Sequence, residues 1–492
     1  MHVEADLRPG QPAFAVVGLP DTAVQESRER VRSGIANQAL SLPPQRIVVN
    51  LAPADLRKIG PQYDLPIALA ILASSGQIRP GGLDGLGAVG EMALDGTLRP
   101  LQGTLAMAEH AAASGWARLM VPRANAREAS LIRGVTVVGV TDLRQALRYL
   151  NGDVPPPGDT VDPGELLADG GDVEGPDMGE IRGQATARRV LEISAAGGHS
   201  LLMVGPPGGG KTMLARRLPG LLPPMGVDDA ITVTRIHSVA GLMPVGTPML
   251  TRRPFRAPHH TTSAVGLVGG GRYPQPGEVT LAHRGVLFLD EVCAFAPAAL
   301  DALRQPLEEG YVDITRGMVS ARFPAKPLLV CAGNPCPCGY RGDPDRPCTC
   351  APGRAEAYAG RLSGPIMDRI DLQLVVPRLD AEDVVGLSPP GETTPAIRER
   401  VVGARRFGRA LGRMIENAML SPADARNSCR LDGSCTRLLT QAVARLHLSA
   451  RAHDRLLRVS RTIADLDGRE RVESEHILEA LTYRRSHGSR IG

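Results

Sequence analysis

Residues 200–212 read Ser-Leu-Leu-Met-Val-Gly-Pro-Pro-Gly-Gly-Gly-Lys-Thr, an apolar run that opens into the pattern Gly-x-x-x-x-Gly-Lys-Thr. The apolar run predicts a buried strand and residues 213–218 predict a helix, so the glycine loop joins a strand to a helix. In such a P-loop, backbone N–H groups and the helix N-terminus point at phosphate oxygens. The alternative is a Gly-Pro loop with a chance lysine, which the flanking strand and helix disfavour.

The loop supplies the contacts that a nucleotide needs. Lys211 can reach the β- and γ-phosphates, and the hydroxyl of Thr212 can ligate Mg²⁺. ATP and Mg²⁺ are therefore the expected cofactors. The expected nucleotide-binding residues of the loop are Gly205, Pro206, Pro207, Gly208, Gly209, Gly210, Lys211 and Thr212.

Two other apolar runs end in polar side chains. Residues 285–289 lead into Asp290 and Glu291, and residues 328–332 lead into Gly-Asn334. An acid at the carboxyl end of a parallel strand beside a P-loop is placed to hold Mg²⁺. We expect Asp290 to hold the metal, Glu291 to polarise the attacking water and Asn334 to orient that water. The three strands together predict an ATPase with an α/β core.

The totals exclude several classes of protein. The chain has 492 residues, enough for about three domains, and its net charge is only +4, so any nucleic-acid-binding surface must be local. No apolar run approaches the roughly 20 residues that span a bilayer, and no signal peptide opens the chain. We expect a cytoplasmic protein with no membrane partner, whose eight cysteines are reduced unless they hold metal.

Composition divides the chain into four segments. Residues 1–150 mix predicted strands and helices, as in an α+β domain. Residues 151–177 are rich in Pro, Gly and acidic residues, which predicts a flexible linker. Residues 178–380 contain the nucleotide site, and residues 381–492 are predicted to be helical.

Four cysteines lie in one loop rich in Gly, Pro and Asp. They form two Cys-x-Cys pairs, Cys336 with Cys338 and Cys348 with Cys350. Four thiolates are a plausible tetrahedral ligand set for structural Zn²⁺. Because Cys-x-Cys is less diagnostic than Cys-x-x-Cys, unligated thiols remain the alternative. The other cysteines, Cys293, Cys331, Cys429 and Cys435, are expected to be structural.

The insertion before Asp290 is locally basic. It carries four arginines and the adjacent His259 and His260 within residues 252–272, ending at Arg272. A strand would point the two histidines in opposite directions, so we do not assign them to a metal. Residues 311–323 predict a hairpin with Arg316 at its tip. These features predict either a mobile basic surface or a solvated charged loop.

Several motifs match one family across nearly the whole chain. They are Gly205-Pro-Pro-Gly-Gly-Gly-Lys-Thr212, Arg253-Pro-Phe-Arg-Ala-Pro-His-His260, Gly285-Val-Leu-Phe-Leu-Asp-Glu291, Ser363-Gly-Pro-Ile-Met-Asp-Arg369 and Leu448-Ser-Ala-Arg451. Through them the chain resembles the ComM/YifB group of magnesium-chelatase-like AAA+ ATPases. The resemblance implies a AAA+ P-loop core with a helical C-terminal lid, assembled as a homohexameric ring with ATP at the subunit boundaries.

The resemblance also implies further site residues. Arg369 corresponds to the arginine finger that reaches a neighbour's γ-phosphate. Arg451 corresponds to sensor 2 and reaches the nucleotide of the same or an adjacent subunit. Ile181 and Gly183 lie in the lead-in that borders the adenine in relatives.

Residues 1–150 resemble the Lon-protease-like domain that begins these ATPases. Lon proteases carry a nucleophilic serine in the stretch that matches residues 60–64, where this chain has Gln62, and a lysine that aligns with Leu105. An amide cannot act as the acyl-transfer nucleophile. We therefore expect an inactive Lon-like domain.

The family is associated with DNA branch migration in natural transformation. That association implies a motor with helicase or branch-migration activity on single-stranded or branched DNA, with Arg272 and Arg316 near the substrate. Two alternatives remain, the motor of a metal-chelatase-like complex and a protein remodeller that uses residues 1–150 as an adaptor. An ATP-dependent protease is disfavoured because of Gln62.

Overall fold

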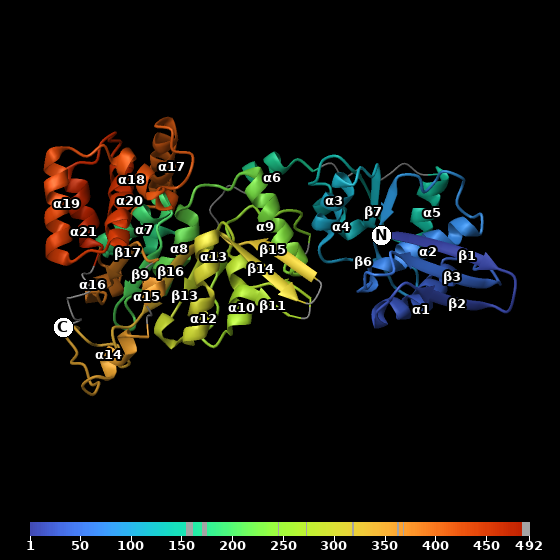
Figure 1. The fold of residues 1–492 in the computed structure, drawn as a ribbon, viewed down its shortest axis with the longest axis horizontal. Helices are drawn as coiled ribbons and strands as arrows, with labels where there is room; N and C mark the ends of the chain where they lie inside the picture. The colour runs from blue at the N-terminus through green and yellow to red at the C-terminus, as the bar shows by residue number, and fades with distance from the viewer. Residues whose placement is uncertain are drawn as a thin grey trace. The chain divides into compact units, whose positions relative to one another are not determined.

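The computed structural model describes residues 1–153, 161–169, 175–244, 246–271, 273–316, 319–361, 364–367 and 369–484 (Figure 1). The chain forms two compact units. The first unit combines Met1–Asp169 with Ala230–Thr251, and the second combines Gly170–Asp229 with Arg252–Gly492. The sequence-based boundaries placed Ala230–Thr251 in the nucleotide-binding segment, whereas it folds with the first unit. Arg272, Ser363 and Asp368 lie outside the described residues.

One sheet of the first unit consists of β1 (His2–Arg8), β3 (Arg46–Ala52) and β2 (Ala13–Val17), in that order. β3 pairs antiparallel with β1 and parallel with β2. Helix α1 (Thr22–Asn37) begins at Asp21, whose side chain accepts a hydrogen bond from the N–H of Val24. The short η1 (Pro61–Tyr63) and helix α2 (Asp64–Ser74) follow β3 along the chain.

The second sheet of this unit is parallel, in the order β4-β7-β8. Its strands are β4 (Leu86–Ala88), β7 (Arg118–Pro122) and β8 (Thr136–Val140), and β5 (Glu91–Met92) pairs with β6 (Leu98–Arg99). The accompanying helices are α3 (Thr104–Ala113), α4 (Arg123–Ala129), α5 (Leu143–Asn151) and most of α9 (Val227–Val239). This α/β mixture agrees with the sequence.

The expected linker contains a helix, α6 (Pro163–Asp169). Asp162 explains its start, because its carboxylate accepts a hydrogen bond from the N–H of Gly164 at 2.7 Å. Pro163 at the first helical position has the required φ and needs no N–H partner. Among the described residues of this segment, Pro163–Asp169 are therefore helical.

The second unit is built on a parallel five-stranded sheet in the order β10-β13-β16-β9-β17. The strands are β10 (Phe255–Arg256), β13 (Val286–Leu289), β16 (Leu328–Gly333), β9 (Leu201–Val204) and β17 (Leu372–Val375). Before β9 come η2 (Met178–Glu180) and α7 (Ala185–Gly197), and after it comes α8 (Lys211–Leu221). The strand, loop and helix predicted around residues 200–218 are confirmed.

Shorter elements occupy the connections of this sheet. They are α10 (Ala264–Val268), β11 (Gly269–Gly270), β12 (Gln275–Pro276), α11 (Glu278–Leu281), η3 (Val292–Ala294), α12 (Pro297–Ala302), α13 (Arg304–Glu309), α14 (Arg354–Ala359), α15 (Gly364–Met367) and α16 (Ala381–Val384). The predicted hairpin is confirmed, since β14 (Tyr311–Arg316) pairs antiparallel with β15 (Val319–Pro324).

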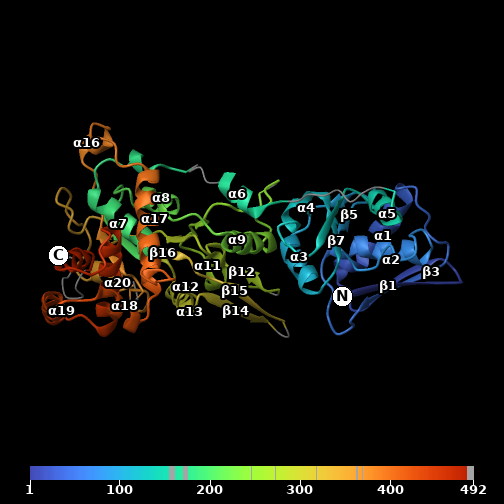
Figure 2. The same ribbon diagram turned by 90° about the horizontal axis from the view of Figure 1, so that it is seen from above.

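The C-terminal part of the second unit is helical. Its elements are α17 (Thr394–Ala410), η4 (Asn417–Met419), α18 (Pro422–Cys429), α19 (Gly433–Leu446), α20 (Ala450–Leu466) and α21 (Ser474–Thr482). Within this unit the helices and the β14–β15 hairpin lie at opposite ends (Figures 1 and 2). None of the helices in the described part of the chain is both long and apolar enough to cross a bilayer.

Candidate nucleotide-binding site

The P-loop has the backbone that its glycines predict. Gly208 and Gly210 adopt φ values of 81° and 80°, which favour glycine. A Cβ at Gly205 would lie 2.1 Å from the carbonyl oxygen of Val376, so only glycine fits beside β17. The loop then turns into α8 at Lys211.

Lys211 lies at the centre of the site. Its Nζ donates hydrogen bonds to the carbonyl oxygens of Gly205 at 2.8 Å and Pro206 at 2.9 Å, and lies 3.3 Å from Asn334 Oδ1. Burial lowers the pKa of this ammonium, and the negative charge of Asp290 opposes that shift. A cation with little solvent around it interacts more strongly with a phosphate than one in water does.

The predicted magnesium ligands also meet. Thr212 Oγ1 donates to Asp290 Oδ2 at 2.8 Å. β16 lies between β9 and β13 in the sheet, and Asn334 directly follows its carboxyl end, where its Oδ1 lies 3.3 Å from Lys211 Nζ. A hydroxyl and a carboxylate are hard oxygen ligands suited to Mg²⁺, which also takes ligands from water and phosphate. The structure therefore brings Lys211, Thr212, Asp290 and Asn334 together.

Glu291 follows the strand in an unusual conformation. Its φ is 48°, a region that non-glycine residues seldom occupy and that recurs at functional sites. His260 Nδ1 lies 3.5 Å from Glu291 Oε2. The sequence did not assign this histidine a role. The contact could have been anticipated from the position of His260 shortly after β10, because β10 lies next to β13, the strand that leads to Glu291.

The two histidines do not belong to a strand. They lie beyond the end of β10 (Phe255–Arg256), so the alternation of a strand does not apply to them. Their rings are 4.1 Å apart and tilted by 35°. His259 Nδ1 contacts Thr261 Oγ1 at 2.8 Å, whereas His260 faces Glu291.

Arg369 lies near the amino-terminal ends of the parallel strands, at the opposite end of the sheet from the P-loop. Ser200, which precedes β9, hydrogen-bonds through its hydroxyl to the carbonyl oxygen of Arg369. The P-loop instead follows the carboxyl end of β9, and a strand of that length spans about 13 Å. The Arg369 guanidinium forms an ion pair with Glu308 of α13.

Arg451 lies with Arg369. Burial lowers the pKa of the Arg369 guanidinium, and the positive charges of Arg304, Arg451 and Arg455 lower it further. Arg451 belongs to the first turn of α20, and Arg455, one turn later, lies 3.7 Å from Asp371. The structure thus brings the two sequence-predicted arginines together. They lie near the amino-terminal ends of the strands, whereas the P-loop of the same chain lies at the carboxyl ends.

The lead-in to α7 contacts the P-loop through a residue that the sequence did not single out. Gln184 Nε2 donates to the carbonyl oxygen of Gly209 at 2.9 Å. Ile181 is buried in the core of the second unit. Gly183 has a φ of 61°, and a Cβ there would lie 2.2 Å from the Asp383 carboxylate. Ile181 and Gly183 thus lie in the segment that leads to Gln184, and the contact of that segment with the P-loop is made by Gln184.

The four loop cysteines converge. The Sγ atom of Cys336 lies 3.3 Å from that of Cys338 and 3.7 Å from that of Cys348, and the Cys338 and Cys348 sulfurs are 3.5 Å apart. Together with the Cys350 sulfur, these make four Sγ atoms that all lie within 4.8 Å of one another. A hydrogen bond from the backbone N–H of Tyr340 is the main cause that lowers the pKa of the Cys338 thiol to about 5. The other four cysteines are buried, as expected.

The insertion is less basic at its surface than the sequence predicted. Arg253 Nε donates to the carbonyl oxygen of Pro223 at 2.7 Å, and burial lowers the pKa of its guanidinium to about 10. Arg256 forms a two-pronged ion pair with Glu278, at 2.6 and 2.7 Å. These two arginines stabilise the fold. Arg316, at the end of β14, is exposed.

The first unit does not place a nucleophile at the Lon-like positions. The Gln62 amide donates to the carbonyl oxygen of Ile59 at 2.6 Å, and Leu105 is fully buried in α3. Neither side chain can attack a carbonyl or act as a base.

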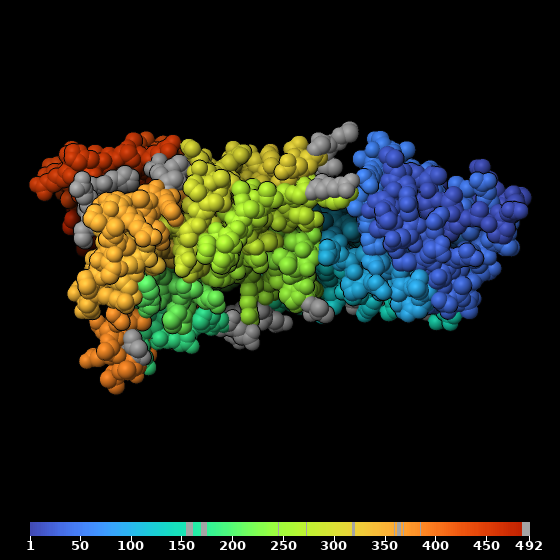
Figure 3. Space-filling model, turned by 90° about the horizontal axis from the view of Figure 1, so that it is seen from below, coloured from blue at the N-terminus to red at the C-terminus, as the bar shows by residue number. Residues whose placement is uncertain are grey.

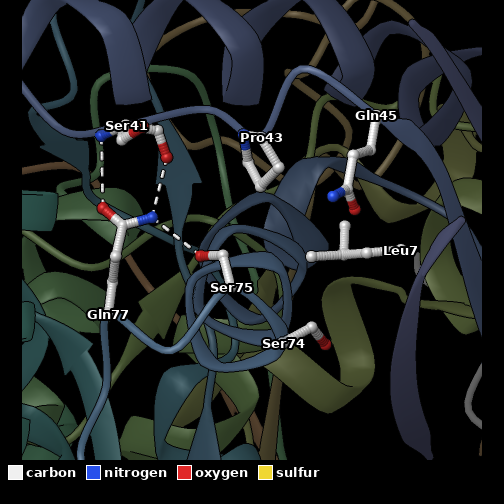
Figure 4. A pocket seen from close by; sticks show the side chains of 7 residues that line it. All are labelled: Leu7, Ser41, Pro43, Gln45, Ser74, Ser75 and Gln77. Carbon is white, nitrogen blue, oxygen red and sulfur yellow. Dashed lines mark hydrogen bonds between the residues drawn. The ribbon is translucent and has the colours of Figure 1, made fainter. Parts of the chain in front are cut away.

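A pocket in the first unit contains none of the predicted site residues (Figure 4). Gln77 Nε2 donates to the backbone carbonyl oxygen of Ser41 and to Ser75 Oγ, both at 2.7 Å. No ionisable side chain lines it. The lining residues are Leu7, Ser41, Pro43, Gln45, Ser74, Ser75 and Gln77.

Comparison with known families agrees with this geometry. Residues 177–384 match the family described as Magnesium chelatase, subunit ChlI. Residues 3–125 match Subunit ChlI of Mg-chelatase, and residues 391–484 match Magnesium chelatase, subunit ChlI C-terminal. The magnesium-chelatase subunit ChlI of Euglena gracilis is 26% identical over 156 residues, 27% of this chain and 45% of that protein.

Several relatives extend over nearly the whole chain, among them two proteins named YifB and ComM. The YifB protein of Escherichia coli is 41% identical over 98% of this chain and 93% of its own length. The competence protein ComM of Haemophilus influenzae is 42% identical over 98% of this chain and 94% of its own length. The parallel sheet, the P-loop and these relatives lead to one assignment. The chain belongs to the ComM/YifB family of magnesium-chelatase-like AAA+ proteins.

Proposed function

We propose that this protein is a cytoplasmic ATPase that couples the hydrolysis of Mg²⁺-bound ATP to the remodelling of DNA. The meeting of Lys211, Thr212, Asp290 and Asn334 at one sheet edge carries the ATPase assignment. Lys211 binds the β- and γ-phosphates, Thr212 and Asp290 hold the metal, and Asn334 orients the water that Glu291 polarises. The glycine loop supplies N–H donors for the phosphates.

The position of Arg369 and Arg451 supports an oligomeric ring. Both lie at the end of the sheet opposite their own P-loop, so we infer that they act on the nucleotide of a neighbouring subunit. In that ring, Arg369 is the arginine finger and Arg451 is sensor 2. A homohexamer is the expected assembly, as in the family.

Two observations support DNA as the substrate. A relative of nearly equal length is named for competence, and Arg316 is exposed on a hairpin of the ATPase unit. We propose that single-stranded or branched DNA contacts this hairpin and that branch migration is the resulting activity. The alternative, an ATPase motor in a chelatase-like or protein-remodelling complex, is favoured by the similarity to the Euglena chelatase subunit.

We expect DNA to stimulate ATP turnover. Purified protein should hydrolyse ATP faster with single-stranded, forked or four-way DNA than without DNA. If a ring neutralises six or more phosphates, DNA binding should fall by about 10³-fold or more between about 50 and 200 mM salt. Turnover that is the same with and without every DNA would exclude this substrate and favour the chelatase-like alternative.

A pair of variants in one hairpin sharpens this test. Arg316→Ala should weaken DNA binding and reduce its salt dependence, while ATP turnover without DNA stays unchanged. Arg322→Ala is the matched control, because Arg322 is exposed but already paired with Asp313 at 2.7 Å. Equal effects of the two variants would argue against a DNA contact at Arg316.

We expect His260 to position Glu291. A partly exposed ion pair contributes about 0–1 kcal/mol, so His260→Asn should change the rate at saturating ATP by up to about fivefold with little change in ATP affinity. His259→Asn is the control, because His259 contacts Thr261 instead. Steady-state kinetics of the two variants makes the comparison, and indistinguishable rates would remove this role.

We further propose that Cys336, Cys338, Cys348 and Cys350 bind one structural Zn²⁺. With Zn–S bonds of about 2.3 Å, the sulfurs of a tetrahedral site lie about 3.8 Å apart. The sulfur separations of 3.3 to 3.7 Å are close to that value. Thiolate ligands suit zinc, and the sulfurs of all four cysteines lie within 4.8 Å of one another.

A further inference from the structure

The cysteine loop has few other contacts that could hold it in place. All of residues 335–353 are described, and they form no helix or strand. Most side chains after Arg341 are exposed, and Pro335, Cys336 and Gly339 are the buried positions among residues 335–349. The segment of the second unit that carries this loop and α14 (light orange) lies at the surface in Figure 3. A loop of this length without regular structure or a hydrophobic core is often held in one conformation by a bound metal ion.

This loop is joined to the nucleotide site on its amino-terminal side. Asn334, two residues before Cys336, directly follows β16, and its Oδ1 lies 3.3 Å from Lys211 Nζ. Cys336 is fully buried, so its side chain is enclosed by the fold three residues after the end of β16. The position of the Asn334 side chain therefore depends on how firmly Cys336 is held.

A second contact follows the first cysteine pair. Gly339 comes directly after Cys338 and closes a tight turn, because its N–H donates to the carbonyl oxygen of Cys336 at 2.9 Å. A Cβ at Gly339 would lie 2.5 Å from Cδ and 2.8 Å from Cγ of Pro207. The backbone at Gly339 is thus packed directly against the P-loop. The first Cys-x-Cys pair has a nucleotide-site contact on each side.

We propose that the zinc-bound cysteine loop clamps the P-loop and Asn334, so that metal occupancy sets the affinity of this protein for ATP. The inference rests on the zinc proposed above. Bound metal fixes Cys336 and Cys338 and, through them, the backbone at Gly339 and the amide of Asn334. Without metal, the loop is no longer held by the four cysteines. Pro207 then loses its packing against Gly339, and Lys211 loses its contact with Asn334. In metal sites, loss of the groups that orient the ligands costs about 10- to 100-fold in affinity or activity, and we expect a loss of similar size in ATP affinity here.

The experiment measures zinc content and ATP affinity on the same full-length protein. Zinc is quantified by elemental analysis, and affinity is measured by equilibrium binding of a fluorescent ATP analogue with Mg²⁺, so that neither DNA nor turnover is needed. We expect one zinc per chain in the wild type. Removal of zinc by a chelator should weaken nucleotide binding at least tenfold, and added zinc should restore it.

Substitutions separate the metal from the clamp. Cys336→Ser should lose zinc and bind ATP at least tenfold more weakly, whereas Cys435→Ser, in the buried part of α19, should keep both properties. Gly339→Ala should keep zinc and still bind ATP at least tenfold more weakly, because its Cβ displaces Pro207. Gly353→Ala is the matched control, since Gly353 lies in the same loop with a similar φ of 79°. A Cβ added at Gly353 would lie 4.0 Å from Glu356 Oε2, an ordinary contact distance.

The outcomes distinguish the two proposals. Wild-type protein without zinc would overturn both the metal site and the clamp. Zinc in the wild type, together with normal ATP affinity in the chelated protein and in Gly339→Ala, would overturn the clamp and leave the zinc site standing. If Cys336→Ser does not fold, the chelated wild type and the two glycine variants still decide the question. Equal weakening in Gly339→Ala and Gly353→Ala would attribute the effect to backbone strain and would also overturn the clamp.

Discussion

Arg369→Ala should lower ATP turnover by about 10³- to 10⁵-fold, the contribution of an arginine finger in other phosphate hydrolases. The planar guanidinium can bind two phosphate oxygens at once, so Arg369→Lys should recover little of the loss. ATP binding to the variant should change much less, because the P-loop is intact. If Arg369 served only its ion pair with the half-exposed carboxylate of Glu308, its removal would affect stability, and turnover would fall by far less than about 10³-fold.

Mixing two inactive variants tests whether Arg369 acts across a subunit boundary. An Arg369→Ala subunit keeps Glu291, and a Glu291→Gln subunit keeps Arg369. At a boundary where the first binds ATP and the second supplies the arginine, the site is complete. Turnover should therefore reappear on mixing, and the absence of any recovery in assembled mixed rings would place Arg369 in its own subunit's site. Arg430→Ala, which removes one arginine of an exposed ion pair with Glu470, is the control for loss of charge.

Glu291→Gln should bind ATP normally and hydrolyse it about 10²- to 10⁴-fold more slowly, the usual contribution of a positioned general base. The amide has almost the same shape as the carboxylate but cannot accept the proton of the attacking water. The protein should therefore accumulate with ATP bound, which filter binding and single-turnover assays detect. Normal turnover would show that another group activates the water. Glu470→Gln is the control, since it changes an exposed carboxylate in the same way.

The sequence predicted for a local reason that the polar residues of the candidate nucleotide site lie together. The P-loop and the two other strand ends each combine an apolar run with a fixed polar residue, and parallel strands bring their carboxyl ends to one edge. Lys211, Thr212, Asp290 and Asn334 accordingly lie together. The hairpin at residues 311–323 was equally local, because its two strands pair with each other.

The remaining features depend on contacts between distant segments. Arg253 and Arg256 looked like surface charge, but a carbonyl at Pro223 and a carboxylate at Glu278 hold them in the fold. His260 meets Glu291 only because β10 lies next to β13. The contact of Gly339 with Pro207 joins two loops far apart in the sequence. Neither hydrophobic periodicity nor motif spacing encodes such pairs.

The folding of Ala230–Thr251 with the first unit has a consequence for how this protein can be divided. The chain leaves the first unit after Asp169, returns at Ala230 and leaves again after Thr251, so no single peptide-bond cleavage separates the units. Within the first unit, Ser238 Oγ and the Leu105 N–H share the Glu128 carboxylate. A protein shortened to begin after the linker would lose Leu105 and Glu128 but keep Ser238. Residues Ala230–Thr251 would then lack the rest of the first unit, with which they fold.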